Sequence, residues 1–426
     1  MPMLRATPRG EDHQRPASPL FGWIVVVGSG FAAAFGSFVL FAAGYAAISA
    51  AIAADAGWGP TSIAFGATLY LLFQAVAQPL CAHAVNVWGA RQVALASILL
   101  FGLTLLAFSM VGRYPAGFFI GLAALAITGS GTNGLPYART ITGWFSKRRG
   151  LALGISGGAA ALGLMLVPLF TERLVRTAGW SMTLRYAAVL ELAICLPVVA
   201  VTVWERRGKF SPSEMEPKRA EDDPIVHFSQ IAALRIFWLL AAAFFFLGLG
   251  VYAVVPNTVT ILFTTGRLPL RDIAIAQSIT GPAFLLGRLL TGYLLDRITP
   301  FLIGAGLALF LSTQLLLYAT APGFVLIVAA AALAGFSVGG EGDLMPYIAA
   351  KFFPAGAMST VFGLHLFAFF IGATLGPFMF TTLRWTLGGI PAALVVIAAM
   401  QVIPLIVFLG LARKDAMCLR ARMLGT

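Results

Sequence analysis

The stretch "ITGPAFLLGRLLTGYLLDR", Ile279 to Arg297, is long and apolar enough to cross a lipid bilayer, yet it holds an arginine, Arg288. Arg288 lies eight residues before Asp296 at the end of the run. At 1.5 Å per helical residue this is about 12 Å, near the middle of a ~30 Å hydrocarbon core. A cation there costs about 2.5–3.5 kcal/mol on insertion scales. We therefore expect Arg288 to face a bundle interior or a water-filled cavity.

The composition is that of a membrane protein. Of the 426 residues, 59% are hydrophobic and only 10% are charged, whereas about a quarter are charged in a soluble domain. The net charge of +12 does not indicate a nucleic-acid partner, because the charges are few and lie between long apolar runs. A lipid bilayer is the expected partner. The three cysteines show no metal or disulfide spacing and are expected to be apolar fillers.

Twelve apolar runs are long enough to be membrane-spanning helices. Their expected ranges are 21–52, 60–84, 92–112, 115–143, 150–172, 182–204, 232–264, 273–295, 300–319, 322–349, 357–381 and 388–412. The first run exceeds the 7–15 residues of a signal-peptide core, so it is interpreted as an uncleaved span. The fold class is thus an all-α integral membrane protein with twelve transmembrane helices.

The expected organisation is two six-helix bundles joined by a polar linker. The ranges are a tail at 1–20, bundles at 21–204 and 231–412, a linker at 205–230 and a tail at 413–426. With the N-terminus inside, inner segments hold nineteen Lys and Arg residues and outer segments six, so both termini are expected to be cytoplasmic. We expect a monomeric multi-pass protein of the cell inner membrane.

The two halves repeat each other at an offset of about half the chain. The matching pairs are Ala82 with Gly292 and Asn86 with Asp296 at 210, and Gly154 with Gly363, Gly163 with Gly372 and Pro168 with Pro377 at 209. Parallel repeats of six helices are typical of secondary transporters, whose substrate site lies between the repeats. The two bundles are therefore expected to be pseudo-symmetric.

Over nearly its whole length the chain resembles the major facilitator superfamily (MFS). The loop pattern G-x-x-x-D-R-x-G-R-R of that family is degenerate in the first half, where Ala82, Asn86 and Val87 replace Gly, Asp and Arg. The candidate gating residues on these loops are Asn86, Gly89, Arg91, Gly292, Asp296 and Arg297. Such loops tie helix ends together, and the loss of Asp at Asn86 predicts a weaker lock in the first half.

A second segment resembles the monocarboxylate-transporter branch and the related oxalate/formate antiporters. In "WFSKRRGLALGISGGA", Trp144 to Ala159, the pattern aromatic-Phe-x-Lys-Arg-x-x-Leu-Ala-x-Gly is matched. "GW" at residues 22–23 matches only the end of that branch's first-helix motif, whose acidic residue is absent. From the residues alone, Lys147 to Arg149 are a positive-inside anchor, and Gly154 and Gly158 permit close helix packing.

The resemblance implies that the eighth-helix arginine, Arg288, binds the substrate carboxylate. Its guanidinium suits this role, because it can grip a carboxylate through paired hydrogen bonds; a structural ion pair is the alternative. Glu341 and Asp343 lie at a similar depth in the tenth span, as coupling groups or charge partners. Gly339, Gly340, Gly342 and Pro346 make a regular helix doubtful here, and a helix broken at midplane often marks a transporter binding site.

Other polar residues in the spans are weaker candidates for the substrate site. His365 is a candidate second cation or proton carrier in the eleventh span, with hydrogen-bonded packing as the alternative. Tyr45, Tyr70, Asn133, Tyr137, Tyr252 and Tyr347 are candidate cavity ligands, each with interface packing as its alternative. The branch has an acidic residue one turn before the arginine, where this chain has Phe284.

The predicted function is secondary transport of a small organic anion, a monocarboxylate by preference, through alternating access. Proton symport and anion exchange both remain open. Broad-specificity efflux of amphipathic compounds is the alternative within transport, and an integral membrane enzyme or a channel the alternatives outside it. The sequence shows no nucleotide-binding loop, metal cluster or nucleophile–base set, so no enzymatic activity, cofactor or metal is expected.

Overall fold

The computed structural model describes residues 19–205, 228–265, 269–320 and 323–424. Most of the expected N-terminal tail and most of the expected linker lie outside these residues. So do the side chains of the last part of the C-terminal tail.

The first half of the described chain is a series of long helices. They are α1 (Pro19–Phe35) and α2 (Ser37–Ala56), α3 (Pro60–Trp88), α4 (Ala90–Val111), α5 (Pro115–Thr128), the 3-10 turn η1 (Gly129–Thr132), α6 (Gly134–Trp144), α7 (Arg149–Leu190), the π-helical turn η2 (Glu191–Cys195) and α8 (Leu196–Thr202). α1 with α2 forms one span, and α5, η1 and α6 form another.

The second half has the same plan. Its elements are the short α9 (Phe228–Ala232), α10 (Arg235–Val254), η3 (Val255–Asn257), α11 (Thr258–Thr265), α12 (Leu270–Leu295), α13 (Pro300–Thr320), α14 (Phe324–Phe352), η4 (Ala355–Ala357), α15 (Met358–Thr386), α16 (Ile390–Met400) and α17 (Val402–Leu424).

Eleven segments of the described chain are long and apolar enough to cross a membrane, and one of them contains two spans. Arg149–Thr202 has 54 residues. At 1.5 Å per residue it would measure about 80 Å, more than twice the hydrocarbon thickness. It folds back at Gly179, whose φ of 82° and ψ of 164° interrupt the helix. The prediction of twelve spans is confirmed.

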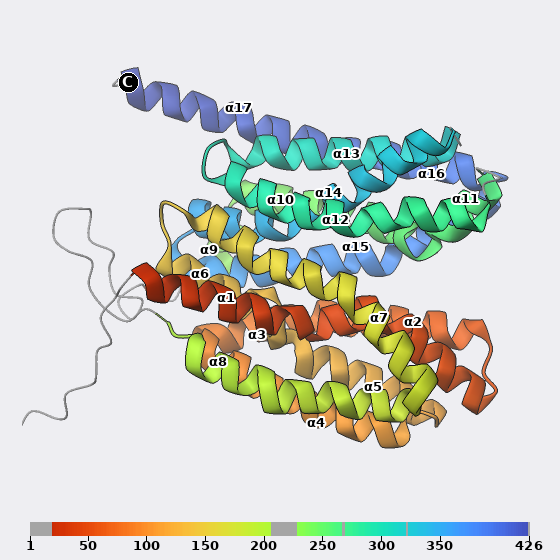
Figure 1. Cartoon of the computed structure of the whole chain (residues 1–426). Coiled ribbons are helices and arrows are strands. Elements are labelled where there is room, and N and C mark those ends of the chain that lie inside the picture. The colour runs from red at the N-terminus through yellow and green to blue at the C-terminus, as the bar shows by residue number, and fades with distance from the viewer. Residues whose placement is uncertain (1–18, 206–227, 266–268, 321–322, 425–426) are drawn as a thin grey trace, which may run out of the picture.

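The helices form two bundles that lie side by side (Figure 1). α1 to α8 make the lower bundle in this view and α10 to α17 the upper one. The bundles meet where α7 packs on α12 and α3 packs on α15, and α14 and α15 also contact α6. The pseudo-symmetric architecture expected from the sequence is therefore present.

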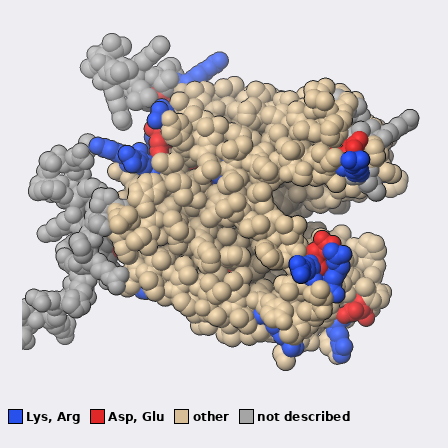
Figure 2. Space-filling view, in the orientation of Figure 1, with Lys and Arg blue, Asp and Glu red and all other residues tan. Residues whose placement is uncertain are grey.

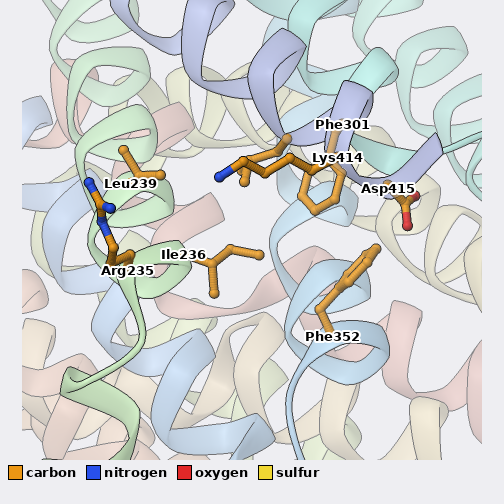
Figure 3. Close-up of a pocket in the computed structure, with 8 residues that line it drawn as sticks. Arg235, Ile236, Leu239, Phe301, Phe352, Lys414 and Asp415 are labelled. Carbon is orange, nitrogen blue, oxygen red and sulfur yellow. The ribbon is translucent and has the colours of Figure 1, made fainter. Parts of the chain in front are cut away.

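The surface is divided as a membrane requires. On the face shown in Figure 2, charged side chains gather at the two ends and leave an uncharged belt between them. Large apolar side chains such as Leu286 (61% exposed) and Phe378 (71%) point outward, where lipid would cover them. The molecule is hollowed between the two bundles at the end opposite the described chain ends (Figures 1 and 2).

Candidate functional site

Arg288 lies on the inner side of α12, between the two bundles. Its Nη1 donates a hydrogen bond to Oδ1 of Asp343 on α14, with an N–O distance of 2.6 Å. The side chains are 18% and 3% exposed, respectively, whereas Leu286, two residues before Arg288, is 61% exposed on the outside. Arg288 therefore faces the protein interior and not lipid, as its depth in the bilayer predicts.

Glycine residues on two neighbouring helices make room for this ion pair. A Cβ atom on Gly157 of α7 would lie 2.6 Å from Arg288 Nη1 and 2.8 Å from Asp343 Oδ1. A Cβ atom on Gly342 of α14 would lie 2.6 Å from the central guanidinium carbon. The cation is thus held where α7, α12 and α14 meet, so it touches both bundles.

Several polar atoms around the pair remain unused. Within the described part of the chain, Arg288 Nε, Asp343 Oδ2 and Glu341 Oε2 are buried without a hydrogen-bond partner. The ring of Phe284 lies 5.6 Å from the guanidinium carbon. A guanidinium that uses Nη1 for Asp343 keeps its Nε–Nη2 edge for a second acceptor, and a carboxylate fits such an edge.

Glu341 and Asp343 differ in their relation to Arg288. α14 is continuous from Phe324 to Phe352, so the break expected in this helix is wrong. Residues two apart on a regular helix point in different directions, which explains why Asp343 alone is bonded to Arg288. Glu341 is 3% exposed and within electrostatic reach of the same cation.

Aromatic side chains line the space where the bundles face each other. Tyr252 of α10 lies within electrostatic reach of Glu341 in its own bundle and of Tyr70 in the other. Tyr70 shares a 2.6 Å hydrogen bond with Ser37, and its ring stacks on Phe41 at 3.6 Å. The structure therefore brings Arg288, Asp343, Glu341, Tyr252 and Tyr70 to one region.

The structure does not bring His365 or Tyr137 to this region, which corrects their expected place. His365 is fully buried in the C-terminal bundle, with its ring centre 5.3 Å from that of Phe237 and its Nε2 3.3 Å from Phe237 O. Tyr137 packs with Cys195 in the core of the N-terminal bundle. For both residues the packing alternative describes the observed contacts.

The remaining candidates occupy different positions. Tyr45 donates to the backbone oxygen of Ile63 within its own bundle. Asn133, between η1 and α6, accepts a hydrogen bond from the Phe38 backbone at 3.0 Å. Tyr347 lies near the closed end of the bundle interface, with its ring 5.4 Å from Lys351 Nζ.

The end of the interface on the side where α1 begins and α17 ends is closed by contacts between the bundles. Asp296 accepts hydrogen bonds from the backbone of Gly150 at 2.8 Å and Leu151 at 2.9 Å, and so caps α7. At the related position, Asn86 donates to Thr360 Oγ1 at 2.9 Å. Arg149 also reaches across, to Ala350 O at 3.0 Å.

The other predicted gating residues stay within their own bundles. Arg91 lies 3.7 Å over the Trp204 ring and donates to Ala200 O, while Arg297 lies 4.2 Å over Tyr293 of its own helix. Gly89 has a φ of 89° and forms the turn between α3 and α4. Only Gly292 joins Asp296 and Asn86 at the interface between the bundles, because a Cβ there would lie 2.7 Å from the Gly154 Cα.

The two sequence segments that resemble the monocarboxylate branch contact each other. The ring centres of Phe145 and Trp23 are 4.8 Å apart, and those of Trp144 and Phe21 are 5.5 Å apart. Trp144 Nε1 also donates to Trp204 O at 2.7 Å. The aromatic start of this segment thus anchors α1 and the end of α8 at the closed end, whereas Gly157, farther along it, lies against the Arg288–Asp343 pair.

The structure also reveals polar groups that sequence reasoning missed. Gln74 and Gln78 on α3 are 0% and 1% exposed, and no side-chain nitrogen or oxygen of either has a hydrogen-bond partner in the described residues. Their spacing of four residues places both amides on one face of an apolar helix, and this pattern could have indicated a polar site from the sequence alone. The described chain holds no group of three metal-ligating side chains.

Comparison with known proteins identifies the family. The profile of the Major Facilitator Superfamily matches residues 26–377, so the chain belongs to this superfamily of membrane transporters. An "MFS-type transporter" of Gibberella moniliformis is 28% identical over 68% of this chain and 68% of its own length. The crystal structure of the human organic anion transporter MFSD10 has the same fold, with a TM-score of 0.69 at 15% identity over 93% of this chain and 100% of that chain.

Two shorter matches carry more specific names. The fujikurins efflux protein of Gibberella fujikuroi is 29% identical over 40% of this chain and 35% of its own length. Mouse monocarboxylate transporter 11 is 33% identical over 31% of this chain and 30% of its own length.

Proposed function

We propose that this MFS transporter carries a small organic anion, with Arg288 as the ligand of its carboxylate group. The observation that carries the proposal is the buried cation at the junction of the bundles, with one nitrogen on Asp343 and Nε without a partner in the described chain. Asp343 neutralises the cation when the site is empty. A substrate carboxylate then takes the free Nε–Nη2 edge.

The position of Arg288 couples binding to transport. Since the guanidinium touches Gly157 of one bundle and Asp343 of the other, a bound anion is sensed by both. Asp296 and Asn86 each bond the opposite bundle at the closed end. These bonds break when the two bundles rotate relative to each other and open that end. The resemblance of 144–159 to monocarboxylate carriers and the match to mouse monocarboxylate transporter 11 support this substrate class.

The orientation and coupling belong to the same proposal. The end at which α1 begins and α17 ends faces the cytoplasm, because the positive-inside pattern of the sequence assigns most Lys and Arg residues to cytoplasmic segments. Glu341 and Asp343 are the candidate proton carriers. Uptake driven by an imposed pH gradient indicates symport, whereas uptake that requires internal anion indicates exchange.

The decisive experiment compares variants of Arg288 in proteoliposomes. Uptake is measured for carboxylates that stabilise the purified wild-type protein in a thermal-shift screen. Arg288→Met removes the charge and is expected to reduce uptake about 100-fold or more, and Arg288→Lys, which lacks the paired donors, about tenfold.

Arg185→Lys is the matched control, since Arg185 lies on α7 and bonds Ser109 within its own bundle. This control is expected to transport like wild type. Undiminished uptake by Arg288→Met would remove the proposal, and a thermal-shift screen in which no carboxylate binds would do the same.

Efflux of amphipathic compounds is the second candidate. The aromatic contacts at the bundle interface, such as Phe38 with Phe370 at 5.9 Å, and the match to the fujikurins efflux protein favour it. It predicts transport that is indifferent to esterification of a substrate's carboxyl group. The anion proposal predicts that the ester is not transported.

A further inference from the structure

The N-terminal bundle has uncharged residues at the repeat positions of the ion pair of the C-terminal bundle. The segment "NGLPY" (133–137) in the fourth span corresponds to "DLMPY" (343–347) in the tenth, with the Pro-Tyr pairs aligned at an offset of 210. This register places Asn133 on Asp343. It is the same offset that relates Asn86 to Asp296.

On the neighbouring helices, the same offset of 210 makes Gln78 of α3 the counterpart of Arg288 of α12. The structure supports this equivalence independently. The carbonyl oxygen of Arg288 lies 2.8 Å from a Cβ built on Gly154, and that of Gln78 lies 3.0 Å from a Cβ built on Gly363. Because Gly154 and Gly363 are themselves repeat positions, Gln78 and Arg288 occupy corresponding places in the two interfaces.

The amide side chains at these places have unused hydrogen-bonding atoms. Both polar atoms of Gln78 and of Gln74, which corresponds to Phe284, and Nδ2 of Asn133 are buried without a partner in the part of the chain described. Buried polar groups in folded proteins are normally paired, so five unpaired atoms in one region call for a ligand or ordered water. All three of these positions carry uncharged amides, whereas the repeat positions of Gln78 and Asn133 in the other bundle carry Arg288 and Asp343.

The contacts on either side of Gln74 show where its face of α3 points. Tyr70, one turn before it, bonds Ser37, whose backbone nitrogen donates to Thr132 Oγ1 at 2.9 Å. Cys81, seven residues after it and on the same face, interacts with Ser130. Gln74 therefore faces the η1 turn, where the fourth span is interrupted just before Asn133.

A ligand can approach this turn from the space between the bundles. Gly134 is exposed, and a Cβ atom built on it would meet no atom within 4 Å. Yet α6 is surrounded by α1, α3, α4, α7, α14 and α15, so this open space is inside the molecule and not on the lipid face. It lies beside Asn133, the counterpart of Asp343.

We propose that Gln74, Gln78 and Asn133 form a second half-site that takes a neutral hydrogen-bonding group of the substrate, such as a hydroxyl, keto or amide group. Amides both donate and accept hydrogen bonds, which suits such groups, and they lack the charge that would favour a second carboxylate. The inference rests on the proposed function. The substrate is then a polar-substituted carboxylate, with its carboxylate on Arg288 and its polar group on the amides of the opposite bundle.

The test uses matched pairs of carboxylates that differ by one polar group. Butanoate, 3-hydroxybutanoate and 3-oxobutanoate form one set, and phenylpropanoate with its hydroxylated and keto counterparts another. Binding is measured by thermal shift and by inhibition of uptake, with wild type and with Gln78→Met, which keeps the side-chain length and removes the amide. We expect wild type to bind a polar member about tenfold more tightly than its apolar counterpart, and Gln78→Met to bind both alike.

The outcomes separate this inference from the proposed function. If apolar carboxylates bind wild type as tightly as polar ones and Gln78→Met changes nothing, the half-site is overturned while Arg288 keeps its role. A second result would also overturn the half-site: Arg288→Met loses binding of both polar and apolar carboxylates, while Gln78→Met binds both as wild type does. Arg288 would keep its proposed role. If no carboxylate binds, the proposed function falls and the half-site falls with it.

A second measurement needs no substrate. Gln78→Arg places a charge among unpaired amides and is expected to lower the apparent melting temperature. Adding Asn133→Asp, which copies the Arg288–Asp343 pair, is expected to restore at least half of that loss. If the double variant is no more stable than Gln78→Arg alone, the two side chains are not in reach of each other and the half-site is overturned.

Discussion

The two interfaces that join the bundles have the same shape but different chemistry. In the α7–α12 interface, Gly154 lies against Gly292, and in the α3–α15 interface Gly363 lies against Ala82. The repeat positions that carry charge in or beside the first interface carry amides in or beside the second. The pairs are Arg288 with Gln78, Asp343 with Asn133, and Asp296 with Asn86.

This difference shows what each interface contributes. Arg, Asp, Gln and Asn all offer planar hydrogen-bonding groups, so the repeat keeps the packing and the hydrogen-bonding shape while it removes charge from one side. A substrate site between these interfaces, as proposed, has one charged and one neutral side. Such a site is suited to an asymmetric ligand. The contacts that close the cytoplasmic end are also expected to be stronger at Asp296, which is charged, than at Asn86, which is not.

The largest expected effect comes from breaking the ion pair. Asp343→Asn leaves Arg288 buried without its counter-ion, and such changes cost about 3–5 kcal/mol. The uncharged equivalent, Asn133→Ala, is expected to cost about 1–2 kcal/mol, because it loses one hydrogen bond to the Phe38 backbone. Thermal unfolding in detergent measures both, and equal losses would contradict the charge difference between the two sides.

The close backbone contact of α7 with α12 gives the next largest effect. A Cβ on Gly154 would lie 2.8 Å from the Arg288 carbonyl oxygen, which cannot move without its helix, so Gly154→Ala is expected to cost about 1–3 kcal/mol. Gly158→Ala is the matched control, since its Cβ would first meet the flexible Leu289 side chain at 3.3 Å. If Gly158→Ala is as destabilising as Gly154→Ala, the contact of Gly154 with the Arg288 carbonyl oxygen is not the closest constraint between α7 and α12.

The smallest expected effects concern the closing contacts. Asp296→Asn weakens two charge-assisted bonds to the start of α7 and is expected to destabilise the closed end by about 1 kcal/mol. Asn86→Asp adds the missing charge near the start of α15 and is expected to stabilise it by about 0.5 kcal/mol. The distance between spin labels on Val87 and Ile298 reports opening.

These paired substitutions should move the label distances in opposite directions. Asp296→Asn is expected to increase the population with a wide separation, and Asn86→Asp to decrease it. Shifts of the same sign would show that the two loops do not act as equivalent locks.

Much of the architecture was predictable from sequence because it follows from one-dimensional constraints. The hydrocarbon thickness sets the length of an apolar run, so most of the expected span ends lie within a few residues of the observed helix ends, although the fifth span continues to the kink at Gly179 and α17 to Leu424. The depth of Arg288 follows from counting helical residues, and the cost of a cation in lipid sets its inward direction. The offset of the repeat located Asp296 and Asn86 at corresponding loops.

The choice of partners was not predictable in the same way. Glu341 and Asp343 differ by two residues, and only the continuous course of α14 decides that Asp343 meets Arg288. Glycine and proline in the tenth span favour a break there, but α14 is continuous, and the described chain is instead interrupted within other spans, at Gly36, η1 and η3 among them. His365 has the chemistry of a ligand, and only the rings of Phe237 and Phe244 around it show a packing position.

The sequence by itself determined that this protein is a helical membrane protein with two related halves and a cation inside an apolar span. Hydrophobicity, helical rise and internal repetition act along the chain, so they can be read from it. Only the tertiary structure decided which side chains face each other across the bundles, because that depends on the rotation of each helix about its own axis. A rotation of one residue position, about 100°, is enough to exchange a ligand for a packing residue.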